Sequence, residues 1–151
     1  MELDPEVTAT AHDYFGLRPH HNIRCVHGDA RAYLEGAAEG RFDRIYVDVY
    51  GGQESLPPPL ITLEAFHLMR ARLLPGGMVA INVIGTTHGL ESTRFWSWVE
   101  TFRAAFDASA LYLHLGQDYP DRQNVLLAGA ADAAAEFPAR AGLFDRWMPE
   151  E

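Results

Sequence analysis

The sequence predicts a doubly wound α/β fold with a mainly parallel sheet, and two observations support this class. Short runs rich in β-branched residues alternate with longer segments of helical period, as happens when each strand is followed by a helix. Two of the runs, RIYVDV (44–49) and MVAINVI (78–84), are almost continuously apolar, which is typical of strands covered on both faces. At 151 residues and 48% hydrophobic, the chain can form one domain with its own core.

The first part of the chain contains two predicted helices. Pro5 to Phe15 is expected to be helical, because Asp4 can act as the N-cap and proline suits the first helical position. A strand at 23–27 is expected to precede a second helix, from Asp29 to about Glu39. Glu2 and Leu3 would be the tail of a further strand.

The later part is expected to hold two longer helices. One runs from Thr62 to Leu74 and should be stopped by Pro75-Gly76-Gly77, and the other covers Ser92 to Phe106, with aromatic residues at helical spacing. We expect strands at 44–49, 78–84, 110–115 and 124–129. Residues 1–131 would then form one partial nucleotide-binding domain, and 132–151 a C-terminal helix or tail.

One loop of this arrangement is where a site is expected. The segment GGQESLPPP (51–59) follows a strand, and its three prolines favour an extended path. In open α/β sheets, ligands bind beyond the carboxyl ends of the strands. We therefore expect the functional residues near this loop.

Composition excludes several classes of function. The formal charge of −9 and the pI near 5.1 argue against binding a nucleic-acid backbone or an anionic membrane surface, since both need a basic face. The apolar runs are shorter than the roughly 20 residues that span a bilayer, and the first residues do not have the pattern of a signal peptide. These features predict a soluble cytoplasmic protein.

Cysteine and histidine give little support for other chemistry. Cys25 is the single cysteine and lies within a predicted strand, where we expect a small buried hydrophobe. His12, His20-His21 and His27 show no spacing that recurs on one helix face, so no metal site is predicted.

Three acidic residues stand at or just past predicted strand ends, namely Glu2, Asp29 and Asp48. Each has a simple structural explanation: Glu2 could be solvated, Asp29 could cap a helix, and an aspartate after a strand is common in turns. Together they suggest more, because parallel strands bring their carboxyl ends to one edge, where these carboxylates could meet one ligand. Asn82 could bond across the sheet edge near that site, or simply satisfy its own amide.

The same residues carry a resemblance to a known family. The run ELDPEV…YFGL…GDARAYL…FDRIYVDVYGG…LPPPLITLEAF…LLPGGMVAINVIG, within residues 1–130, resembles the class I S-adenosylmethionine-dependent fold of spermidine synthases and spermidine-synthase-like proteins. The resemblance implies a Rossmann-like α/β domain that lacks its first strand and first helix. An exposed strand edge of such a domain could pair with a second copy, so a homodimer is one expected partner state.

The resemblance also implies roles for single residues. Glu2 would accept hydrogen bonds from the ribose hydroxyls of S-adenosylmethionine or its decarboxylated form, and Asp29 and Ala30 would contact the adenine. Asp48 would be the catalytic carboxylate that helps to deprotonate an attacking amine. Tyr50 would line the pocket of a small-molecule acceptor. No metal is implied.

Two alternatives remain open at this stage. Spermidine synthases usually carry a second aspartate three residues after the catalytic one, and Gly51 occupies that position here, although Glu54 could substitute. A small-molecule methyltransferase is therefore the first alternative to aminopropyl transfer. A non-catalytic binding or interaction module from a truncated enzyme is the second, because no glycine-rich loop of the nucleotide-binding kind is found in the sequence.

Overall fold

The computed structural model describes residues 1–18, 22–51, 56–90, 92–106, 110–114 and 122–132. The chain divides into two compact units, Met1–Ala37 and Ala38–Glu151, which we describe separately. The predicted C-terminal helix or tail at 132–151 lies outside the described residues, apart from Asp132.

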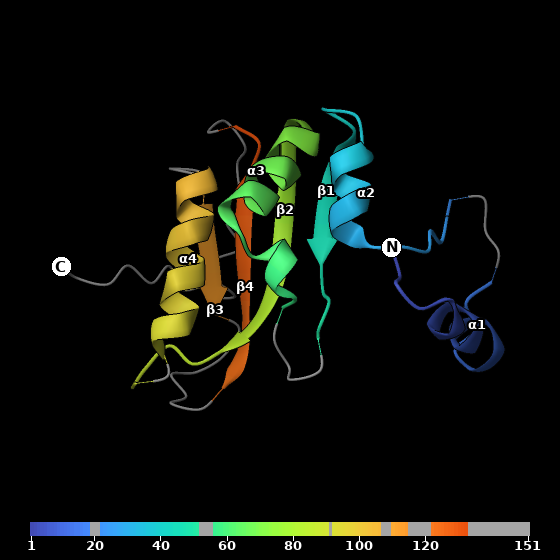
Figure 1. Cartoon of the computed structure of the whole chain (residues 1–151), viewed down its shortest axis with the longest axis horizontal. Coiled ribbons are helices and arrows are strands. Elements are labelled where there is room, and N and C mark those ends of the chain that lie inside the picture. The colour runs from blue at the N-terminus through green and yellow to red at the C-terminus, as the bar shows by residue number, and fades with distance from the viewer. Residues whose placement is uncertain (19–21, 52–55, 91, 107–109, 115–121, 133–151) are drawn as a thin grey trace, which may run out of the picture. The chain divides into compact units, whose positions relative to one another are not determined.

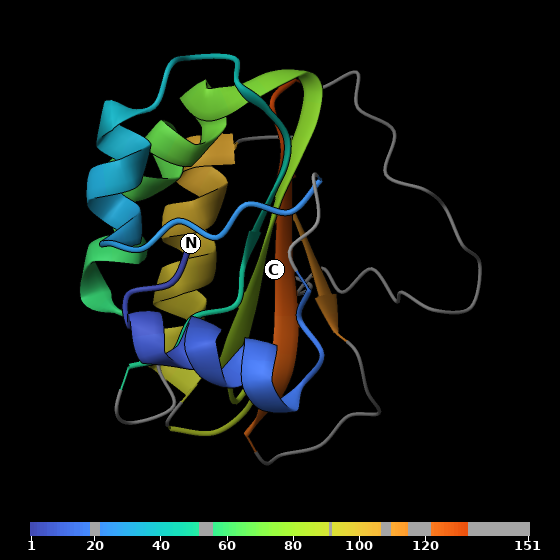
Figure 2. The same ribbon diagram turned by 90° about the vertical axis from the view of Figure 1, so that its right-hand side faces the viewer.

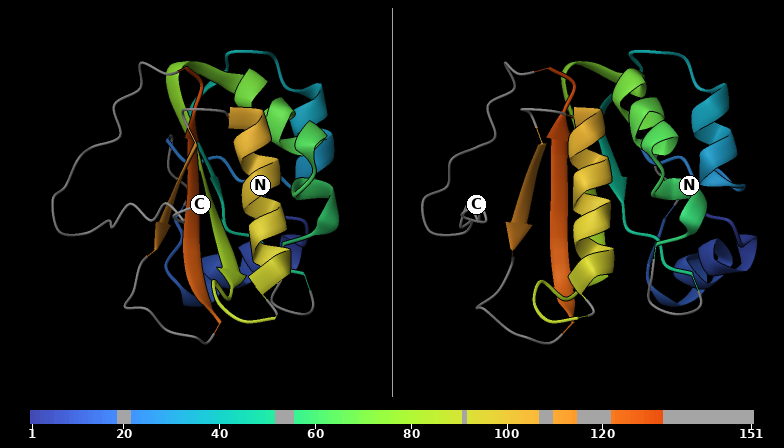
Figure 3. Two further views of the ribbon diagram at one scale, coloured as in Figure 1. Left: turned by 90° about the vertical axis from the view of Figure 1, so that its left-hand side faces the viewer. Right: turned by 60° about the vertical axis from the view of Figure 1, so that its left-hand side comes forward.

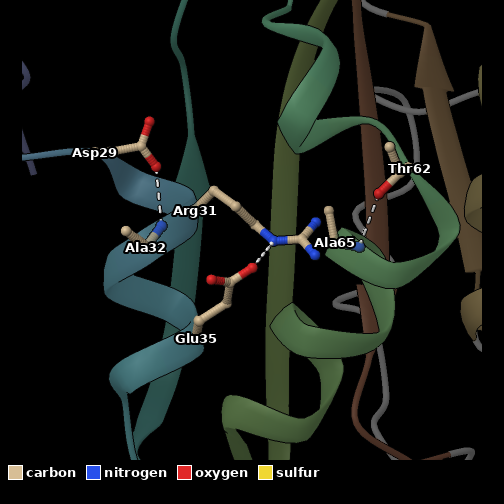
Figure 4. Close-up of polar contacts among 6 residues, drawn as sticks. All are labelled: Asp29, Arg31, Ala32, Glu35, Thr62 and Ala65. Carbon is tan, nitrogen blue, oxygen red and sulfur yellow. Dashed lines mark hydrogen bonds and ion pairs between the residues drawn. The ribbon is translucent and has the colours of Figure 1, made fainter.

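The first unit contains helices α1 (Pro5–Tyr14) and α2 (Ala30–Gly36), which are labelled in Figure 1. Asp4 caps α1, because its Oδ1 accepts a hydrogen bond of 2.9 Å from the backbone N–H of Glu6. Asp29 caps α2 in the same way, through a bond of 2.9 Å from the N–H of Ala32 (Figure 4). Both predicted helix starts are thus confirmed, whereas α2 ends three residues before Glu39.

The strand predicted at 23–27 does not form a ladder. In the described part of the first unit, the pairing at its end is an isolated parallel bridge between Glu2 and His27. Cys25 is exposed, so its predicted burial is wrong. A segment held by single bridges has no sheet against which to bury alternate side chains, and apolar character alone does not supply one.

The second unit is built on a sheet of four strands. These are β1 (Phe42–Val47), β2 (Leu73–Gly85), β3 (Ala110–His114) and β4 (Gln123–Ala130), in the order β1-β2-β4-β3. β1 and β2 are parallel, whereas β4 is antiparallel to both β2 and β3. Three strands therefore share one direction, but the reversed β4 lies between two of them, so the sheet is mixed and not mainly parallel in its pairings.

Helices α3 (Leu63–Arg72) and α4 (Ser92–Phe106) cover one face of this sheet (Figures 2 and 3). Their aromatic side chains form the centre of the core: the rings of Phe66 and Phe102 meet edge to face at 5.2 Å, and those of Phe102 and Phe106 stack at 4.5 Å. The two predicted helices are thus confirmed, α4 with the predicted bounds. Thr62 caps α3 by accepting a bond of 3.1 Å from the N–H of Ala65 (Figure 4).

Two local expectations in this unit need correction. Pro75-Gly76-Gly77 does not stop α3, which already ends at Arg72; Leu73 is extended, is buried and pairs with Phe42, so the glycines lie inside β2. The proline-rich segment is not fully extended either. It forms a short 3₁₀ turn at Pro58–Leu60, which prolines at the first helical positions tolerate.

Candidate functional site

Asp48 is positioned by the parallel pairing of β1 with β2. Val47, the last residue of β1, pairs with Ile81 of β2. The residues that follow these two are Asp48 and Asn82, and the parallel register places them side by side. The amide nitrogen Nδ2 of Asn82 donates a hydrogen bond of 3.1 Å to Oδ1 of Asp48. The aspartate after a strand end is therefore tied to the neighbouring strand, and its carboxylate remains exposed.

Asn82 extends this contact to a third strand. Its Nδ2 also donates to Oδ1 of Asn124 on β4, again at 3.1 Å. Since a carboxylate only accepts hydrogen bonds, the Asp48 contact fixes which end of the Asn82 amide points toward it. Of the two predicted roles of Asn82, the bond across the sheet edge is the one observed.

Sequence reasoning missed Asn124 as part of the site. It opposes Ile84 in the antiparallel ladder, and this register places it on the same face as Asn82. The available signal was a polar residue at the start of an otherwise apolar strand, QNVLLAGA. Its pairing with β2 depends on the reversed direction of β4, which local periodicity does not indicate.

Tyr50 supplies a second donor to Asp48. Burial first, then the charge of Asp48 and the hydrogen bond to its carboxylate, raise the pKa of the Tyr50 phenol from 10.0 to about 12. The phenol therefore stays protonated at physiological pH and donates to the carboxylate. Tyr50 is still 40% exposed, so the contact lies at the surface of the unit.

This arrangement has a clear chemical capability. Asp48 is an exposed carboxylate oriented by donors from two different segments, the Tyr50 hydroxyl and the Asn82 amide. Such a group can accept a proton from a nucleophile or stabilise a cation next to it. We call the set Asp48, Tyr50, Asn82 and Asn124 the Asp48 network.

In the first unit, backbone hydrogen bonds place Glu2 beside Gly28, the residue that precedes Asp29. The backbone of Glu2 accepts a bond of 2.9 Å from the N–H of Gly28, and its own N–H donates to Val26 at 3.0 Å. Gly28 has φ +146°, a conformation that favours glycine, and it turns the chain from this bridge into the Asp29 cap.

Both carboxylates of this unit make local hydrogen bonds. Oε1 of Glu2 accepts from the N–H of Asp4 at 3.0 Å, and Oδ1 of Asp29 caps α2. Each carboxylate has a second oxygen, and a carboxylate offers about four acceptor sites in all. Ala30 is the first residue of α2. The residues present thus have the acceptor groups that ribose hydroxyls and an adenine amine require.

The predicted meeting of the three carboxylates stays a prediction, because Glu2 and Asp29 belong to the first unit and Asp48 to the second. Glu54, predicted as a substrate-binding residue, lies outside the described residues. Within the described ranges, no group of three or more His, Cys, Asp or Glu side chains could hold a metal ion. None of the described helices is long and apolar enough to cross a membrane.

The class of fold follows from solved structures. A probable spermidine synthase from Corynebacterium glutamicum superposes with a TM-score of 0.74 at 21% identity, over 87% of this chain and 46% of that chain. Human methyltransferase-like protein 13, solved in complex with SAH, gives a TM-score of 0.71 at 17% identity, over 91% of this chain and 62% of the other. The fold is that of class I methyltransferases, as it occurs in spermidine synthases.

A curated relative makes the resemblance more particular. The chain is 34% identical over 89 residues to the polyamine aminopropyltransferase of Vibrio vulnificus, and these residues make up 58% of this chain. It spans 29% of that relative's length. No family model matches the sequence. The resemblance to spermidine synthases drawn from the sequence motifs is thus confirmed.

Proposed function

We propose that the protein is a spermidine-synthase-like transferase that binds S-adenosylmethionine or its decarboxylated form and transfers an aminopropyl group to a small-molecule amine. The observation that carries this proposal is the Asp48 network, an exposed carboxylate held by two donors at the carboxyl edge of β1 and β2. The sequence similarity to a polyamine aminopropyltransferase supports the same reaction class.

Asp48 is assigned the proton-accepting role. The cofactor supplies an electrophilic carbon bonded to a positively charged sulfur. As the lone pair of the acceptor nitrogen forms the new C–N bond, the C–S bond breaks and its electrons stay on sulfur, and Asp48 takes the proton that nitrogen loses. The amide of Asn82 and the hydroxyl of Tyr50 keep the Asp48 carboxylate in one orientation during this transfer.

Cofactor binding is assigned to residues of the first unit. Glu2 would accept hydrogen bonds from the two adjacent ribose hydroxyls, since its second carboxylate oxygen is not used by the Asp4 contact. Asp29 and the backbone of Ala30 would contact the adenine. Because Asp29 also caps α2, its orientation is fixed before a ligand binds.

A methyltransferase acting on a small molecule is the second candidate. Gly51 stands where spermidine synthases usually carry the second aspartate that helps to hold a diamine, and a cationic substrate needs a complementary charge. The similarity in fold to a methyltransferase-like protein fits this reading. In both candidates the bond to sulfur is broken and Asp48 faces the attacking group.

The proposal is tested first by binding. Isothermal titration of the full chain with S-adenosylmethionine, decarboxylated S-adenosylmethionine and methylthioadenosine should give a saturable heat with at least one of them. If none binds at millimolar ligand, both transferase candidates are wrong and a non-catalytic module remains.

Turnover then separates the two candidates. Release of methylthioadenosine that depends on decarboxylated S-adenosylmethionine and an added amine indicates aminopropyl transfer. Formation of S-adenosylhomocysteine from S-adenosylmethionine indicates methylation. A chain that binds the cofactor but forms neither product with a panel of amines, hydroxyl compounds and amino acids would contradict catalysis.

A further inference from the structure

A cavity of about 370 Å³ lies within the second unit, at the end of β2 and beside the first turns of α4, whose place against the sheet is seen in Figure 3. Two arginines contribute to its wall, Arg94 from α4 and Arg122 from the residue before β4. Ile84, Leu90 and Trp98 add apolar and aromatic surface. The cavity thus combines two cationic side chains with a smaller share of apolar surface, which includes the Trp98 indole.

The charge of this wall contrasts with that of the whole chain. The formal net charge is −9, yet among the described lining residues none is acidic and two are arginines. Arg94 is exposed, and within the described ranges its guanidinium makes no hydrogen bond or ion pair. Arginine presents planar donors that match a carboxylate in a bidentate manner, and an indole ring stacks on flat ligands.

The cavity and the Asp48 network are connected by strands β2 and β4, although no residue of the network lines the cavity. Ile84 lies two residues after Asn82 on β2, so both side chains lie on one face of the strand. Ile84 pairs with Asn124, which follows Arg122 by two residues. The strand that borders the cavity therefore also carries Asn82, which donates hydrogen bonds to Asp48 and Asn124.

We propose that the acceptor of the transferase is a small organic anion that also carries the attacking nitrogen; its carboxylate is held by Arg94 and Arg122, and its planar apolar part lies against Trp98. That the bound anion is the acceptor rests on the proposed transfer reaction. The binding of an anion rests on the cavity itself. It also accounts for Gly51, because an anionic acceptor has no use for a second carboxylate at that position.

The test measures binding of three matched probes to the full chain without cofactor, by ligand-observed NMR titration. Benzoate carries the carboxylate and the flat ring, benzamide is its neutral counterpart, and benzylamine is cationic. Benzoate should bind at least about fivefold more tightly than either, and its affinity should fall as salt is raised, since the attraction is screened. Equal affinities for benzoate and benzamide would overturn the inference.

Variants locate the site. Arg94→Ala and Arg122→Ala should each weaken benzoate binding about fivefold, since each removes one charged partner near the surface. Arg103→Ala is the matched control on α4, because Arg103 is exposed, pairs with Glu100 and does not line the cavity. It should leave benzoate binding unchanged. Equal effects of all three substitutions would mean that the anion senses only the general charge, which contradicts a site.

The two proposals fail in different ways. If S-adenosylmethionine and its analogues do not bind but benzoate does, with the predicted response to Arg94→Ala, the transferase assignment is wrong and the anion site stands. If the cofactor binds and benzoate does not, the anion site is wrong and the transferase assignment stands.

Discussion

At the scale of single residues, the Asp48 carboxylate is oriented by one partner that is distant in sequence and one that is near. The Asn82 amide comes from the neighbouring strand and the Tyr50 hydroxyl from the loop that follows Asp48 itself. Such support is what a carboxylate needs if it is to face a reacting atom in one orientation. A substitution of Asp48 can therefore remove the proton acceptor while Asn82 and Tyr50 are kept.

Asp48→Asn should lower turnover by about 100-fold or more, because an amide does not accept the proton that the attacking nitrogen loses. Cofactor affinity should change less than about twofold, since the cofactor contacts are assigned to other residues. Initial rates and isothermal titration measure the two effects. Asp43→Asn is the control, because Asp43 is an exposed carboxylate on the same strand. Unchanged turnover in Asp48→Asn would show that another group accepts the proton.

Tyr50 gives a spectroscopic readout of the same contact. Its pKa of about 12 is caused first by burial and then by Asp48, so Asp48→Asn should lower this pKa without returning it fully to 10.0. The measurement is an ultraviolet titration of phenolate absorbance, in which Tyr50→Phe identifies the contribution of Tyr50 among six tyrosines. A Tyr50 pKa that Asp48→Asn does not move would show that the hydroxyl does not face the carboxylate.

The raised pKa also sets the direction of a change in stability with pH. Below pH 10 the Tyr50 phenol is protonated in the folded and the unfolded chain alike. Between about pH 10 and 12 the unfolded chain loses this proton while the folded chain keeps it, which favours unfolding. The stabilising contribution of Tyr50 is therefore present below pH 10, falls across this window and is gone above it. Denaturant titrations should show a shallower loss in Tyr50→Phe.

At the scale of elements, the local signals in the sequence predicted helix starts well. Asp4, Asp29 and Thr62 all cap helices as side chains of that type do, because the contact involves only residues within one turn. Ser92–Phe106 was equally clear from its aromatic spacing. These features depend on neighbours in the chain, which a single sequence displays directly.

Features that depend on distant neighbours were not predictable in the same way. The segment 23–27 is as apolar as a strand but lacks a ladder, and α3 ends at Arg72 because Leu73 pairs with Phe42. Asn124 entered the site only through the antiparallel register of β4. The sequence therefore indicated Asp48 and Tyr50 and suggested Asn82, but not Asn124, which accepts a hydrogen bond from Asn82.

The packing of α4 on the sheet depends on a glycine of β4. A Cβ atom at Gly129 would lie 2.5 Å from two ring atoms of Phe106 and 3.0 Å from Phe102, both fully buried. Gly129→Ala should therefore destabilise the fold by about 2–3 kcal/mol, because the stacked rings have no room to move. Urea denaturation followed by circular dichroism measures this change in the free energy of unfolding.

Gly36→Ala is the matched control for this prediction. Gly36 is the last residue of α2, and a Cβ atom there would meet nothing within 4 Å. Alanine suits a helix better than glycine, so this variant should be as stable as the parent or slightly more so. Equal losses in the two variants would mean that the glycine's backbone freedom, and not the contact with Phe106, matters.

At the scale of the whole molecule, the core is distributed unequally between the two units. Of the buried apolar side chains described, Leu34 belongs to the first unit, and all the others belong to the second. Regions with few buried apolar contacts open at low free energy, whereas central strands open near the global unfolding free energy. The proposed cofactor contacts Glu2 and Asp29 thus lie in the unit with the smaller described core.

This inequality makes cofactor binding visible by hydrogen exchange of the full chain. Without ligand, amides of α1 and α2 should exchange faster than those of β2 and β4. Saturating S-adenosylmethionine should slow exchange in residues 27–36, because a ligand that binds only the closed form stabilises it by mass action. Glu2→Gln should weaken this protection, while Glu6→Gln, which changes an exposed glutamate in the first turn of α1, should not. Protection limited to the Asp48 network would contradict the assignment of Glu2 and Asp29 to the cofactor.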